Sequence, residues 1–115
     1  MNDINRKLLT LLLEKTNKKL LQWTRGSSVN EYKTELNSAT LSISCIYDTY
    51  GYESYVVCMY NGTGGAIILA NEDKNTSIDY SLVCNLYNAA KDSCTKESET
   101  VESLIKELSN LTQED

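Results

Sequence analysis

Residues 40–48, TLSISCIYD, alternate between apolar and small polar side chains. A period of two is typical of a β-strand whose two faces meet different surroundings. Leu41, Ile43, Cys45 and Tyr47 form one side of this strand. Further segments of strand character, separated by short turns, are residues 20–24, 31–36, 52–61 and 66–70. The middle of the chain therefore predicts an antiparallel meander of four to five strands.

The glycine-rich stretch NGTGG, residues 61–65, joins two of these segments. Phosphate-binding loops place their glycines between a strand and a helix, whose N-terminus then faces the phosphate. Here the glycines lie between two strand segments, and no Lys-Ser or Lys-Thr pair follows them. Asn-Gly between apolar strands is a strong hairpin signal, because both residues tolerate positive φ. We therefore predict a hairpin and not a phosphate loop.

Helical spacing of apolar residues marks both ends of the chain. One helix is predicted over residues 3–17, capped by Asn2 or Asp3. Two more are predicted over 79–94 and 96–109, after a polar loop at 71–77. Their candidate caps are Asp79 and Thr95. The apolar face of the last helix consists of Val101, Leu104, Ile105 and Leu108. Helix, meander, helix, helix is an α+β order, and we expect a single domain over residues 1–115.

The charge and residue usage exclude several chemistries. The net charge of −5 disfavours nucleic-acid binding, and the densest basic stretch, residues 15–19, suits the end of the first helix. The chain has no histidine, so it lacks the commonest general base and metal ligand. The N-terminal apolar run is short and flanked by charges, which predicts neither a signal peptide nor a membrane span. We expect a cytoplasmic protein without metal, cofactor or catalytic residues.

Four cysteines, at positions 45, 58, 84 and 94, show no CxxC spacing. Reduced thiols acting as small apolar side chains are the expected state. A thiol enzyme is the weakest functional hypothesis. It would use Cys94, which lies next to the predicted start of the last helix, where the helix dipole lowers a thiol pKa.

Tyrosine is the dominant aromatic residue, with eight Tyr and no Phe in the chain. Residues 55–69 are apolar on both faces of their predicted strands. Two alternatives stay open: the helices cover opposite faces of the sheet, or one face is left for a partner. For the second alternative, the candidate interface residues are Tyr47, Tyr55, Val57, Met59 and Tyr60.

A different class of function would be a small-ligand binder that sequesters a nucleotide-like signal. An aromatic ring and an arginine beside a flexible loop can stack on such a ligand and neutralise it. The candidate residues for this site are Trp23, Arg25, Tyr50 and Tyr52.

The motifs LLEKT (12–16), LxW (21–23), NxxG (61–64) and LYxxA (86–90) give the chain a resemblance. It resembles a loose group of small bacterial proteins, often encoded near mobile elements, over nearly its whole length. The resemblance carries over no catalytic residue and no function. The sequence thus predicts a non-catalytic interaction protein of bacterial or phage origin, acting in or against host defence. We expect it to self-associate or to bind a protein partner.

Overall fold

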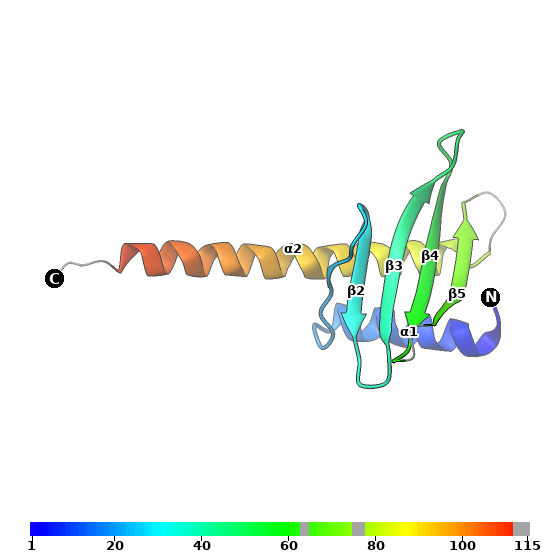
Figure 1. Ribbon diagram of the computed structural model, residues 1–115, viewed down its shortest axis with the longest axis horizontal. Coiled ribbons are helices and arrows are strands. Elements are labelled where there is room, and N and C mark those ends of the chain that lie inside the picture. Colours follow the sequence, from blue (N-terminus) through cyan, green and yellow to red (C-terminus); the bar gives the residue numbers. More distant parts are fainter. Residues whose placement is uncertain (63–64, 75–77, 112–115) are drawn as a thin grey trace.

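The computed structural model describes residues 1–62, 65–74 and 78–111. It has an α+β fold, as predicted, with one antiparallel sheet between two helices in chain order (Figure 1). The elements are α1 (Asp3–Asn17), β1 (Thr24–Arg25), β2 (Glu31–Glu35), β3 (Thr40–Tyr47), β4 (Glu53–Tyr60), β5 (Ala66–Asp73) and α2 (Tyr80–Asn110).

The sheet is a simple meander with the strand order β1-β2-β3-β4-β5. Every neighbouring pair is antiparallel, and Ile43 of β3 lies opposite Tyr32 on one side and Val57 on the other. Successive side chains along a strand point to opposite faces of the sheet, whereas paired residues on neighbouring strands point to the same face. Leu41, Ile43 and Val57 are buried on the face that we call the inner face. The predicted alternation is therefore confirmed.

The glycine-rich stretch connects strand to strand, as predicted. β4 pairs with β5, and the amide of Asn61 donates a hydrogen bond to the carbonyl of Gly65 at 3.4 Å. Residues 63–64 within this turn lie outside the described part of the chain. β5 continues to Asp73 because its pairing with β4 persists to Ser54. The loop predicted at 71–77 was therefore wrong for 71–73, and residues 75–77 lie outside the described residues.

Both helices lie on the inner face of the sheet (Figure 1). Leu9 and Leu12 of α1 share one buried cluster with Val83 and Leu86 of α2, and with the inner-face strand residues. Of the two alternatives, the one in which the helices cover opposite faces of the sheet was therefore wrong. We call the other side of the sheet the open face, because no helix among the described residues packs on it.

The C-terminal part of the chain forms one helix in place of the two that were predicted. The backbone of α2 is helical from Tyr80 to Asn110 without a break at Thr95. The segment contains neither glycine nor proline, so nothing in it forces a helix to stop. Among the described residues, neither helix is both long and apolar enough to cross a membrane.

The first helix has well-defined ends. The Asn2 side chain caps its N-terminus by accepting a hydrogen bond from the Asn5 amide at 2.7 Å. At the C-terminus, Lys19 adopts a left-handed φ of 62°. The amides of Lys19 and Leu20 donate to the carbonyls of Thr16 and Lys15, both at 3.0 Å, which is the hydrogen-bond pattern of a Schellman motif. This motif turns the chain sharply and places Leu20 beside the end of α1.

Candidate interaction surfaces

The second half of α2 projects beyond the sheet as an arm, which we define as residues 95–111 (Figure 1). Cys94 is buried, whereas residues 101–111 are all exposed. A helix of 31 residues is about 46 Å long, whereas five strands span only about 20 Å across a sheet. Because α2 runs across the strands, roughly half of it must overhang. The molecule accordingly measures 62 × 35 × 27 Å.

The arm carries an apolar stripe that no described residue covers. Its members are 49–73% exposed, and they are Val101, Leu104, Ile105, Leu108 and Leu111. Spacings of three and four residues place them on one face of the helix. The stripe continues the register of Val83, Tyr87, Ala90 and Cys94, which pack on the sheet. The face of α2 that is buried in its first half is therefore the face that is bare in its second half.

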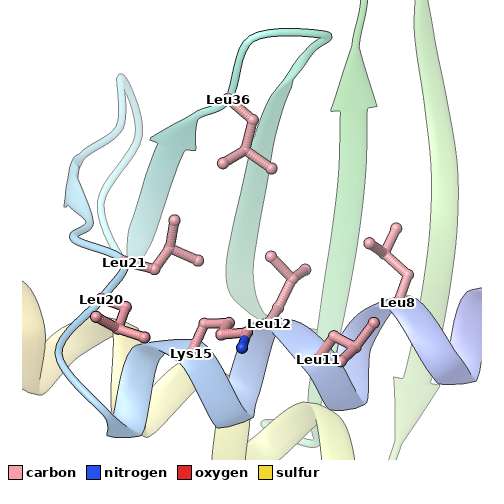
Figure 2. Close-up of a pocket in the computed structure, with 7 residues that line it drawn as sticks. All are labelled: Leu8, Leu11, Leu12, Lys15, Leu20, Leu21 and Leu36. Atoms are coloured by element: carbon pink, nitrogen blue, oxygen red, sulfur yellow. The ribbon is translucent and has the colours of Figure 1, made fainter.

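A second apolar surface lies beside the C-terminal half of α1. Six leucines and one lysine line a groove of about 280 Å³ between α1, the segment that follows it and the turn from β2 to β3 (Figure 2). These residues are Leu8, Leu11, Leu12, Lys15, Leu20, Leu21 and Leu36. Leu11, Leu20 and Leu36 are exposed. We call this surface the leucine groove.

The open face of the sheet is less apolar than these two surfaces. Near its centre, Ser42 and Ser44 of β3 lie opposite the half-buried Cys58 and Val56 of β4, and Ser42 is buried. Ile46 and Ile68 add exposed apolar area toward its borders. The serine hydroxyls make this part of the face more polar than the stripe or the leucine groove.

The five predicted interface residues do not form one surface. Tyr55 and Val57 are buried on the inner face, and Met59 packs against the same core. Tyr47 shares the inner-face register but is exposed at the end of β3. Tyr60 alone belongs to the open face. Tyr55, Val57 and Met59, which we had expected at a partner interface, therefore belong to the protein's own core.

The four predicted ligand-binding residues are also separated. Trp23 is fully buried, and its indole nitrogen donates a hydrogen bond to the Thr16 hydroxyl at 2.9 Å. Arg25 is exposed in the edge strand β1. Tyr50 and Tyr52 are exposed on the β3–β4 hairpin, which extends beyond the end of β2 (Figure 1). None of the four lines the leucine groove or the polar pocket beside Arg6 and Asp79.

Three polar side chains link β4 to the start of α2. The hydroxyls of Tyr55 and Tyr80 both donate to Oε1 of Glu53, at 3.1 Å from Tyr55. Burial raises the pKa of Tyr55, and the hydrogen bond to Glu53 raises the pKa of Tyr80. Burial also raises the pKa of the nearby Tyr87 to about 12. The hydroxyls of Tyr55 and Tyr80 therefore stay protonated and donate to Glu53. The three side chains connect the start of α2 to β4.

The arrangement on which the thiol hypothesis depended is absent. Cys94 is buried in the interior of α2, so no helix N-terminus lies beside it. All four cysteines are free thiols. Within the described residues, no group of three or more Cys, Asp or Glu side chains is placed to hold a metal ion.

No protein-family model, curated protein or solved structure matches the chain. The candidate surfaces therefore rest on geometry and chemistry alone. Sequence reasoning placed Val101, Leu104, Ile105 and Leu108 on the apolar face of a separate last helix. The missed signal was the helical register, because Val101 lies seven residues, or about two helical turns, after Cys94, with no glycine or proline between them.

Proposed function

We propose that this protein is a non-catalytic interaction module and that the arm is its docking element. The observation that carries the proposal is the apolar stripe on the arm. Monomeric proteins rarely leave such a continuous apolar face in water, and amphipathic helices commonly dock by residues at these spacings. The stripe lies on the continuation of a helix whose first half packs in the core.

We further propose a cytoplasmic setting. The free thiols support it, because a reducing compartment keeps cysteines unpaired. The bacterial or phage context rests on the sequence alone. The small-ligand alternative is not carried forward, since its four residues are separated.

In-cell photo-crosslinking tests the docking role of the arm. A photoreactive phenylalanine analogue at Leu108 lies on the stripe, and the same analogue at Asn110 lies on the opposite face of the same helix. We expect covalent adducts to another polypeptide from position 108 and few from position 110. Equal yields at both positions, or no adduct at either, would overturn the proposal.

A further inference from the structure

The arm and the leucine groove are two bare apolar surfaces that complement each other. We propose that the arm of one copy docks in the leucine groove of a second copy, so that two copies exchange arms. This inference rests on the proposed function, because it names the partner of the same arm. The stripe offers branched aliphatic side chains, and the groove offers six leucines around an opening that such side chains fill (Figure 2).

The charges around the groove are basic. Lys15 lines it, and Lys18 and Lys19 follow at the end of α1. Glu14 forms an ion pair with Lys18 at 3.0 Å, and the side chains of Lys15 and Lys19 are exposed. An incoming helix with acidic flanks would be attracted to this surface.

The charges of the arm are acidic. Between residues 95 and 111 the sequence has four acidic residues and two lysines. By helical geometry, Glu102 and Glu107 flank the stripe on its two sides, while Lys106 lies on the opposite face. Two arms side by side would bring like charges together, which is unfavourable. The charge pattern therefore favours the groove of a second copy over its arm.

The positions of the two surfaces suit a reciprocal exchange. The groove lies toward the C-terminal end of α1, and the arm leaves the sheet in the same direction (Figure 1). A two-fold axis near that end can place each arm across the other copy. With this symmetry each arm occupies the groove of the other copy, so no arm or groove is left bare and the assembly closes as a dimer. It also doubles the buried surface, toward the ~1,200–2,000 Å² typical of stable complexes.

Light scattering on the purified 115-residue chain gives the first test. We expect a mass of twice the chain's 12.9 kDa at about 100 µM and low salt. The dimer should dissociate as salt is added, because salt screens the attraction between exposed opposite charges. A monomer at this concentration would overturn the inference while leaving the crosslinking test of the arm intact. Dimerisation that strengthens with salt would point to pairing of like-charged arms and would also overturn it.

Charge exchange between two variants gives the sharper test. The groove variant carries Lys15→Glu and Lys19→Glu, and the arm variant carries Glu102→Lys and Glu107→Lys. Each variant alone meets repulsion at both contacts, so we expect its dimer to be at least about tenfold weaker than that of the wild type. Mixed in equal amounts, the two variants have opposite charges at both contacts and should form a heterodimer.

Recovery of dimer formation in the mixture also shows that both variants are folded. The failure of each variant to dimerise alone is then not caused by a loss of structure. The control variant, Ser103→Lys with Asn110→Lys, adds positive charge to the opposite face of the arm. It should dimerise within about threefold of the wild type. If the groove variant dimerises as strongly as the wild type, or if the mixture stays monomeric, the groove is not the partner of the arm.

Discussion

At the residue scale, the Thr16 hydroxyl fixes the only tryptophan of the chain. It accepts a hydrogen bond from the indole nitrogen of Trp23 and donates one to the Leu12 carbonyl at 2.7 Å. The Trp23 amide donates in turn to the Ser93 hydroxyl of α2 at 3.2 Å. Trp23 thus ties α1, the start of β1 and α2 together, with its one polar side-chain atom satisfied in the core.

Thr16→Val should destabilise the protein by about 1–3 kcal/mol, because it leaves the buried indole N–H without an acceptor. Thr10→Val is the matched control. Its hydroxyl makes the same bond to the carbonyl four residues back, at 2.8 Å, but on the exposed side of α1. The control should cost less than about 0.5 kcal/mol. Urea unfolding followed by tryptophan fluorescence measures both, and equal losses would contradict this role of Thr16.

The sequence could not reveal this role of Trp23. An aromatic residue followed by an arginine and a flexible loop has the same pattern whether the ring is buried or stacks on a ligand. The deciding contact, to Thr16, forms only after the Schellman turn at Lys19 brings the chain back over α1. By contrast, the alternation in β3 was predicted because strand periodicity is local.

At the element scale, α1 and α2 are joined by an ion pair at the start of α2. Arg6 donates to both carboxylate oxygens of Asp79, at 2.9 and 3.0 Å. Asp79 occupies the N-cap position that the sequence predicted, but its side chain makes no capping hydrogen bond. Both carboxylate oxygens instead accept hydrogen bonds from the Arg6 guanidinium. The hydrogen bond to Arg6 holds the pKa of Asp79 below its ordinary value of 3.8.

This ion pair predicts a pH dependence. Because the pKa of Asp79 is lower in the folded protein, the unfolded chain takes up the proton first as the pH falls. The stabilisation by Asp79 is therefore complete above about pH 4 and is lost as the pH falls through the folded pKa. Asp79→Asn should lower the urea midpoint at pH 7, and its difference from wild type should shrink toward pH 2.

Glu14→Gln is the control for this pH dependence. Glu14 also has a lowered pKa, through its hydrogen bond to Lys18, but both side chains are exposed. Exposed pairs contribute little to stability, so its midpoint should stay close to that of wild type. A difference between Asp79→Asn and wild type that stays constant from pH 7 to pH 2 would contradict the assignment.

The continuity of α2 is the main feature of the fold that local sequence signals did not predict. Thr95 followed by Glu97 and Glu99 is the pattern of a helix N-terminus, yet the same residues are tolerated inside a helix. A break requires a residue that stops the preceding helix, and none is present. The overhang then follows from the lengths of α2 and of the sheet, which become known only once α2 is seen to cross the strands.

At the scale of the whole molecule, two helices cover one face of the sheet and leave a bare helical arm. The inner face is filled by α1 and the first half of α2, so the core is complete without the arm. Residues 101–111 of the arm are all exposed, so their apolar side chains add bare apolar area to the molecule. An isolated helix of this length is marginally stable in water, because most helical stability comes from packing an apolar face.

Hydrogen–deuterium exchange of the arm amides tests the central claim most directly. If a second copy covers the stripe, the amides of residues 101–110 should exchange at least about tenfold more slowly at 100 µM than at 1 µM protein, since dimerisation depends on concentration. The amides of β3 lie in the core and serve as the internal control, with protection at both concentrations. Rapid exchange of the arm at a rate independent of protein concentration would contradict the account.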